Sequence, residues 1–91
     1  MGYRVFLHPK AEKALRELHE GTRARIKRGL RSLENDPFRT RSGADIKRLR
    51  GTRGRADAFR LRVGDYRVVY GVDGDMVIVT RVFHRSEGYE F

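Results

Sequence analysis

Apolar residues occupy every second position near the start of the chain, and this alternation predicts a strand. Tyr3, Val5 and Leu7 share one side of an extended segment over residues 3–8, so the strand is expected to be buried mainly on that face. Pro9 follows directly and suits the first turn of a helix, where its missing N–H removes no hydrogen bond.

Two segments with apolar residues three or four positions apart predict a pair of helices. The first carries its apolar stripe at Ala11, Ala14, Leu15 and Leu18. Gly21 is expected to end this helix, and Thr22 is expected to cap the next one. The second stripe lies at Ile26, Leu30 and Leu33, ahead of the stop signal Asn35-Asp36-Pro37. Together the segments predict a helical hairpin, followed by a polar loop over residues 36–44.

The rest of the chain has the alternation and the turn signals of a sheet. A short strand is expected near Ile46 and Leu49, ending at Gly51. Ala58–Val63 alternates strictly, and residues 66–72 and 76–83 follow as further strands. The hairpin signals between these three strands are Gly64-Asp65 and Asp73-Gly74.

The order of these elements is β-αα-ββββ within a single domain of residues 1–91, which predicts an α+β fold. The helices are expected on one side of a mainly antiparallel sheet. The segment 76–83 is apolar on both faces, so we expect it to lie centrally in that sheet.

The charge of the chain narrows the choice of partners. Twenty-one Lys and Arg residues against twelve Asp and Glu give a formal net charge of +9. A field of this sign attracts polyanions, so the candidate partners are DNA, RNA, an anionic membrane surface or an acidic protein.

Several kinds of chemistry are not expected from this composition. The chain has no cysteine, which excludes disulfides, thiolate catalysis and cysteine-based zinc sites. His8 and His19 are expected at the surface or as helix caps, and neither a metal nor another cofactor is predicted. No segment has the pattern of a signal peptide or a membrane span, so the expected location is the cytoplasm, with no membrane partner.

The strand Ala58–Val63 carries the first candidate for chemistry. Its apolar residues face the core, so Arg60 and Arg62 both project from the opposite face. Whether Arg67 of the next strand joins them depends on the register of the turn, which the sequence leaves open. Like charges on neighbouring strands destabilise a sheet, and a bound phosphate is one reason to keep them. A solvated polar face is the alternative interpretation.

A basic stretch precedes that strand. It contains no acidic residue and five cationic ones, namely Lys47, Arg48, Arg50, Arg53 and Arg55. A GxxG sequence at residues 51–54 has the pattern that clamps RNA in KH domains, but here it lies between strands instead of helices. We therefore predict a basic loop that contacts RNA phosphate without sequence preference.

The C-terminal segment brings together three side chains with acid–base or cationic chemistry. His84 carries the only type of side chain whose unperturbed pKa lies near neutrality, so it is the natural proton carrier. Arg85 follows it directly, and Tyr89 provides a phenol that can donate a proton or stack on a base.

These segments resemble the RelE/ParE superfamily, whose members are toxins of type II toxin–antitoxin modules. The resemblance is carried by Leu49-Arg50-Gly51, by RLRVGDYRVVY over residues 60–70 and by HRSEGY over residues 84–89, and it extends over essentially the whole chain. RelE-like members cut messenger RNA in the ribosomal A site, whereas ParE-like members inhibit DNA gyrase. The resemblance implies a cognate antitoxin, the ribosome and mRNA as partners.

The resemblance also implies positions for the active residues. Arg60, Arg67 and Tyr89 match functional positions of RelE, with Arg62 and Arg85 at basic positions beside them. The implied reaction is attack of a ribose 2′-OH on the adjacent phosphate. Cationic groups can stabilise its charged transition state without a metal.

The sequence departs from RelE at three positions. Ala58 and Arg60 stand where RelE has a lysine pair, and Phe83 stands where RelE has a further catalytic arginine. A guanidinium does not readily give up a proton, so we hypothesise that His84 is the general base and Tyr89 the acid. This nuclease requires Arg60, Arg67 and Arg85 to converge on one pocket and not to be locked in internal ion pairs. The alternatives are a ParE-like gyrase inhibitor and a non-catalytic basic RNA-binding domain.

Overall fold

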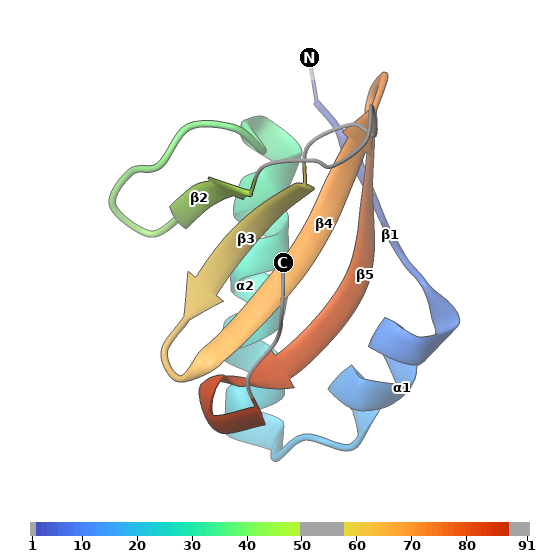
Figure 1. The fold of residues 1–91 in the computed structure, drawn as a ribbon, viewed down its shortest axis with the longest axis vertical. Helices are drawn as coiled ribbons and strands as arrows, with labels where there is room; N and C mark the ends of the chain where they lie inside the picture. Colours follow the sequence, from blue (N-terminus) through green and yellow to red (C-terminus); the bar gives the residue numbers. More distant parts are fainter. Residues whose placement is uncertain (1, 50–57, 88–91) are drawn as a thin grey trace.

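A computed structural model describes residues 2–49 and 58–87 of the chain. The elements are β1 (Arg4–Leu7), α1 (Pro9–Arg16), α2 (Glu20–Asn35), β2 (Asp45–Leu49), β3 (Ala58–Val63), β4 (Tyr66–Asp73), β5 (Met76–His84) and a 3₁₀ turn (Arg85–Glu87) (Figure 1). The expected order of one strand, two helices and four strands is confirmed. None of the described helices is long and apolar enough to cross a membrane.

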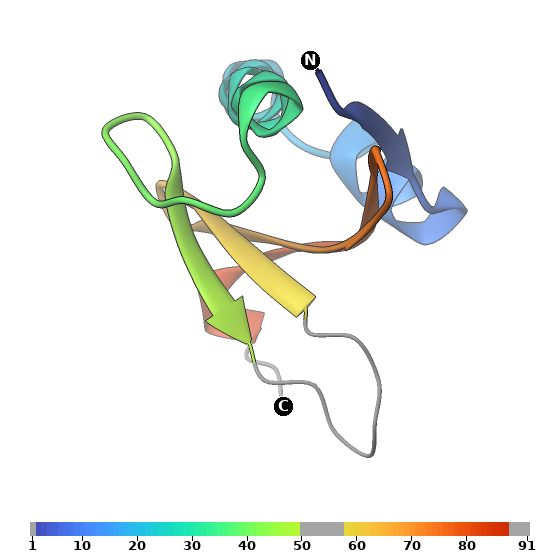
Figure 2. The same cartoon turned by 90° about the horizontal axis from the view of Figure 1, so that it is seen from above.

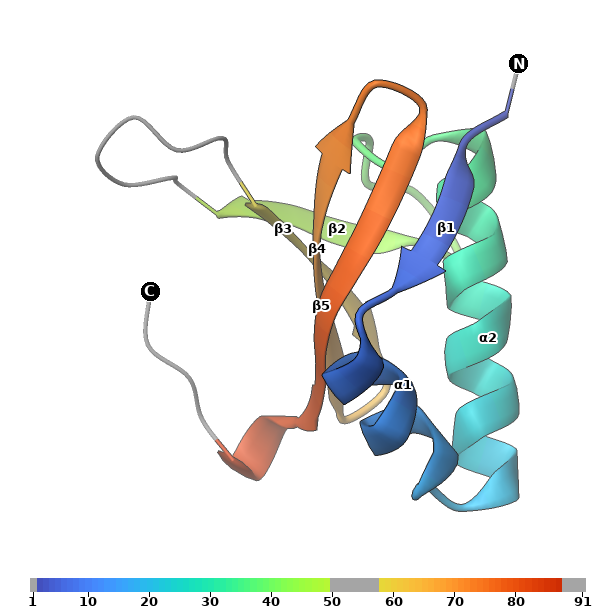
Figure 3. The ribbon, with the colours of Figure 1, turned by 90° about the vertical axis from the view of Figure 1, so that its right-hand side faces the viewer.

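The strands form one five-stranded sheet in the order β1-β5-β4-β3-β2. β1 runs parallel to β5, and the other three pairings are antiparallel. Figure 3 shows β1 lying alongside β5 at one edge of the sheet. The predicted α+β class and mainly antiparallel sheet are confirmed. β5 is an interior strand as expected, although the middle position belongs to β4.

The helices and the sheet enclose a single core on one side of the sheet. α2 lies across this side, and α1 packs against β5 and β1 (Figure 2). The buried core residues are Ala11, Leu15, Ile26, Leu30, Leu33, Ala44, Ile46, Leu61, Val68, Tyr70, Val77, Val79 and Val82. Burial of this apolar surface is the main favourable contribution to folding.

The other side of the sheet is not covered by any helix within the described residues, and we call it the open face. Alternation along the strands and the register between them place on it Asp45, Lys47, Leu49, Ala58, Arg60, Arg62, Arg67, Val69, Arg81 and Phe83. Six of these side chains are charged, and five of the six are cations. The sheet therefore has one apolar face and one face that is predominantly cationic.

The two helices begin at histidines. The Nδ1 atom of His8 accepts a hydrogen bond from the Lys10 N–H, and that of His19 accepts one from the Gly21 N–H, both at 3.2 Å. The expectation that these histidines cap helices is confirmed. The expected boundary between the helices is wrong, because α1 ends at Arg16 and Thr22 lies inside the first turn of α2. The imidazole of His19 supplies the acceptor that a threonine cap would otherwise provide.

α2 approaches β3 closely at a glycine. A Cβ atom at Gly29 would lie 3.0 Å from Leu61 Cδ2 and 3.1 Å from Val63 Cγ2. The absence of a side chain thus lets the helix rest directly on the strand that carries Arg60 and Arg62.

A buried hydrogen bond ties β4 to the segment after α2. The hydroxyl of Tyr70 donates to the carbonyl oxygen of Pro37 at 2.6 Å. Burial raises the pKa of the Tyr70 phenol well above its usual value. This bond fixes the start of the loop that leads into β2.

Candidate nucleic-acid interface

The register between β3 and β4 brings three arginines to the open face. Arg62 lies directly opposite Arg67, and Arg60 lies opposite Val69. This register follows from the two-residue turn at Gly64-Asp65, in which Gly64 has a φ of +57°. Arg67 therefore shares a face with Arg60 and Arg62, which settles the point that the sequence leaves open.

Arg60 is the most enclosed of these cations. Its side chain is 16% exposed, and its Nη2 atom lies 3.3 Å from Asp45 Oδ1. The Nε atom is buried and has no hydrogen-bond acceptor among the described residues. A buried donor without an acceptor is costly, so a shift of the Arg60 side chain that brings this N–H to an anionic ligand would be favoured.

Arg67 and Arg85 both lie at the turn between β3 and β4. Arg67 Nη1 donates to the carbonyl oxygens of Gly64 and Tyr66 at 3.2 and 3.1 Å. Arg85 Nε lies 3.4 Å from Asp65 Oδ1, and both side chains of this ion pair are 64% exposed. Exposed ion pairs contribute little to stability, so a phosphate can compete for Arg85.

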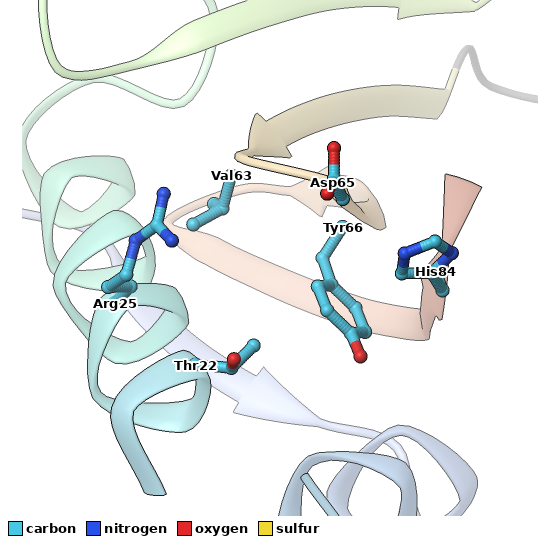
Figure 4. A pocket seen from close by; sticks show the side chains of 6 residues that line it. All are labelled: Thr22, Arg25, Val63, Asp65, Tyr66 and His84. Atoms are coloured by element: carbon cyan, nitrogen blue, oxygen red, sulfur yellow. The ribbon is translucent and has the colours of Figure 1, made fainter. Parts of the chain in front are cut away.

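The structure does not bring His84 together with the arginines. His84 pairs with Tyr66 in the sheet, which places it on the α2 side, and the two rings meet edge to face at 5.1 Å. Figure 4 shows the imidazole beside Tyr66 at a shallow pocket that Thr22 and Arg25 also line. The hypothesised role as general base needs His84 near Arg60 and Arg67, but alternation along β5 turns Phe83, not His84, toward them.

The His84 side chain also organises the segment that follows it. Its Nδ1 atom lies 2.7 Å from Ser86 Oγ and accepts a hydrogen bond from the Ser86 N–H at 3.1 Å. The His84 N–H donates to Glu87 Oε1 at 2.7 Å. The imidazole therefore helps to form the 3₁₀ turn at the end of β5.

The predicted basic stretch is only partly described. Lys47 and Arg48 lie in β2, and alternation places Lys47 on the open face and Arg48 on the same side as Phe59. This position agrees with the short strand expected near Ile46 and Leu49, since β2 pairs with β3 through Leu49. Four further candidate residues lie outside the part of the chain that the structure describes, namely Arg50, Arg53, Arg55 and Tyr89.

Two residues that the sequence analysis did not select also reach the open face. The Arg81 guanidinium lies over the ring of Phe83, with its central carbon 4.6 Å from the ring centroid. Arg81 lies opposite Val69, next to a β-bulge at Val69 and Tyr70. Alternation within β5 could have predicted that Arg81 and Phe83 share a face of the sheet, since they are two positions apart.

The candidate interface consists of cations without a metal-binding group. Within residues 2–49 and 58–87, no three His, Asp or Glu side chains are grouped to hold a metal ion. Arg60, Arg62 and Arg67 lie on one surface, with Lys47 on the neighbouring strand. This arrangement can bind a polyanion and stabilise negative charge that develops on it.

The sequence of the chain matches that of known toxins. The family described as the ParE toxin of the type II toxin–antitoxin system parDE matches residues 5–89. Toxin RelE3 of Methanocaldococcus jannaschii is 33% identical over 79 residues, which cover 87% of this chain and 86% of that protein. The chain belongs to the RelE/ParE toxin superfamily.

Solved structures of RelE toxins share the fold of this RelE/ParE protein. RelE in the archaeal RelE–RelB complex from Pyrococcus horikoshii is 33% identical, with a TM-score of 0.80 over 97% of this chain and 100% of that chain. The RelBE2 toxin–antitoxin complex from Mycobacterium tuberculosis contains a chain that is 30% identical, with a TM-score of 0.76 over 93% and 100% of the respective chains. The family and the fold are therefore established together.

Proposed function

We propose that this toxin is a ribosome-dependent endoribonuclease that cuts mRNA and thereby inhibits translation. The observation that carries the proposal is the placement of Arg60, Arg62 and Arg67 together on the open face, the side of the sheet that none of the described helices covers. A phosphodiester supplies acceptor oxygens and negative charge to such a group of donors. The RelE names of the relatives support the same class of activity.

The proposed reaction is transesterification within the RNA strand. The ribose 2′-oxygen forms a bond to the adjacent phosphorus while the bond from phosphorus to the 5′-oxygen breaks. A base takes the 2′ proton and an acid supplies one to the 5′-oxygen, giving a cyclic phosphate and a free 5′-OH. Arg60, Arg67 and Arg85 stabilise the charge on the phosphate oxygens, which is where preorganised cations contribute most.

The proton transfers form a separate part of the proposal, with His84 as base and Tyr89 as acid. The His84 ring lies on the α2 side of the sheet, so this role requires the ring to turn toward the open face. RNA cleavage that is unchanged in His84→Gln but lost in Arg67→Ala would exclude His84 as the base. His84 would then act only through its contacts with Tyr66 and Ser86.

We further propose a cognate antitoxin as the partner that silences the toxin. Similar structures contain RelE bound to RelB, and the formal charge of +9 favours a partner with an acidic segment. Co-expression of the neighbouring antitoxin gene is expected to restore growth and to yield a complex that survives gel filtration.

The decisive experiment is induction of the toxin without its antitoxin, followed by mapping of the 5′ ends of cellular messages. New ends confined to translated regions are expected for the wild type and are expected to be absent for Arg67→Ala. The matched control is Arg31→Ala, which removes an exposed cation from α2 on the other side of the molecule. Cuts in untranslated RNA as well would contradict dependence on the ribosome.

Inhibition of DNA gyrase is the second candidate function, because the matching family model describes a ParE toxin. A translation assay and a supercoiling assay, run with the same purified protein, separate the two activities. Loss of supercoiling with intact message would replace the nuclease proposal. RNA binding without either effect would leave a non-catalytic RNA-binding domain.

A further inference from the structure

A second cationic site lies at the corner of the molecule between α2 and the end of β3. A hollow of about 370 Å³ is lined there by Arg25, Arg28, Gly29, Gly43, Arg62 and Val63. We propose that this hollow binds a phosphodiester group of RNA, in addition to the phosphate that reacts on the open face. The proposal rests on the proposed function in naming RNA as the polyanion.

The three arginines reach the hollow from different parts of the fold. Arg25 and Arg28 are one turn apart on α2, whereas Arg62 comes from β3 opposite the first residue of β2. Because β2 begins at the residue opposite Arg62, no residue of β2 pairs with Val63, and the corner beside Arg62 is open. Arg62 therefore borders both the open face and the hollow, and it connects the two sites.

The guanidiniums in the hollow form no ion pair among the described residues, because Asp45, which lies opposite Arg62 on β2, binds Arg60 instead. Arg60 and Arg85 on the open side each contact a carboxylate, Asp45 and Asp65. No carboxylate within the described part of the chain forms an ion pair with Arg25, Arg28 or Arg62. Three like charges around one concavity repel each other, and an anion with several acceptor oxygens relieves that repulsion.

The position of Arg25 is set by the backbone next to it. A Cβ atom at Gly64 would lie 2.8 Å from Arg25 Nη2, so the guanidinium packs directly on the turn between β3 and β4. A planar guanidinium held in this way binds phosphate oxygens in pairs and loses little freedom when it does so. This favours a phosphate over the spherical charge of a small ion.

The other cations of α2 provide a matched control. Lys27 and Arg31 are exposed on the same helix and do not line the hollow. The variants R25Q/R28Q and K27Q/R31Q remove the same charge from the same helix, so they change the overall field of the protein equally. Only the first pair changes the hollow.

The test measures binding of the full chain to two fluorescent RNAs whose 2′-O-methyl groups prevent cleavage. One probe is a short unstructured strand, which stands for a message, and the other is a hairpin, which stands for ribosomal RNA. R25Q/R28Q is expected to weaken binding about tenfold at about 0.1 M salt, and K27Q/R31Q less than about threefold. The slope of log affinity against log salt is expected to fall by about 0.7 for the strand or about 0.9 for the hairpin, which corresponds to the loss of one phosphate contact.

The probe that shows this loss identifies the source of the phosphate. Equal losses for both variant pairs would overturn the site, because they would reflect net charge alone. Normal RNA binding with lost antitoxin binding would also overturn it and would assign the hollow to the protein partner. If R25Q/R28Q does not fold, the single variants R28Q and R31Q are compared instead, and R28Q is expected to lose more RNA binding than R31Q. Because neither probe can be cut, a failure of the nuclease proposal leaves this result unaffected.

Discussion

Arg62 and Arg67 lie directly opposite each other on β3 and β4, with both side chains on the open face. Like charges in this relationship destabilise an antiparallel pair. The fold tolerates the repulsion at the edge of a surface that we propose binds RNA, which indicates that these positions serve binding more than stability.

Relief of this repulsion is expected to stabilise the protein. Arg62→Gln should raise the free energy of unfolding by about 0.2–1 kcal/mol, measured by urea denaturation at low salt, because Asp45, opposite Arg62 on β2, pairs with Arg60 and not with Arg62. High salt should reduce the gain, because exposed charges are screened. Arg31→Gln lowers the net charge equally and should show a smaller change; equal gains would mean that the cross-strand pair is not the cause.

Asp45 is expected to oppose RNA binding. Asp45→Asn removes the carboxylate that holds Arg60 Nη2 at 3.3 Å and so leaves this donor to phosphate. We expect about two- to tenfold tighter binding of an uncleavable RNA strand, measured by fluorescence anisotropy. Asp75→Asn is the control, since it removes an exposed carboxylate at the turn between β4 and β5. An equal effect of both changes would point to net charge.

Gly29 is expected to tolerate no large side chain. Gly29→Val should lower the free energy of unfolding by about 1–3 kcal/mol, because the new atoms meet Leu61 and Val63 at close range. Gly21→Ala is the comparison, since its Cβ would contact only the His19 ring at 3.6 Å or more. That change should be neutral or stabilising by up to about 1 kcal/mol. A neutral Gly29→Val would show that α2 can move off β3.

The Tyr70 hydroxyl is expected to make stability depend on pH in the alkaline range. Tyr70→Phe should cost about 1–3 kcal/mol at neutral pH, because the buried carbonyl of Pro37 loses its donor. In the wild type, the contribution of the Tyr70 hydroxyl to the free energy of unfolding is complete below pH 10.0, the pKa of an unperturbed tyrosine. This contribution is lost as the pH rises above that value. The reason is that the unfolded chain then releases a proton that folded Tyr70 retains. Urea denaturation of the wild type and Tyr70→Phe at several pH values measures the difference in their free energies of unfolding. If this difference did not change with pH, Tyr70 would not be the cause of the pH dependence.

The sequence predicted the elements well because their signals are local. The alternation in Ala58–Val63 and the turn at Gly64-Asp65 depend on neighbouring residues, and both predictions are confirmed. The side of the sheet reached by Arg67 depends on register, and the position of His84 depends on the pairing of β5 with β4. Both depend on how neighbouring strands pair, which the pattern within one strand does not fix.

The helix boundary and the corner site show the same limit in different ways. His19 caps α2 with its ring nitrogen, a role for which the sequence favours Thr22 as a commoner capping residue. Arg25 and Arg28 look like ordinary exposed helix positions until α2 is packed next to Arg62. Packing, not composition, turns these three charges into a site.

The parallel pairing of β1 with β5 has a consequence for incomplete chains. Residues Arg4–Leu7 pair in the sheet with Met76–Val79, and α1 also packs on β5. Contacts so distant along the chain close late in folding. A product truncated before Met76 by premature termination or proteolysis therefore leaves its first strand unpaired and cannot assemble the sheet. Damaged copies of the gene or of its message are thus expected to be harmless to the cell.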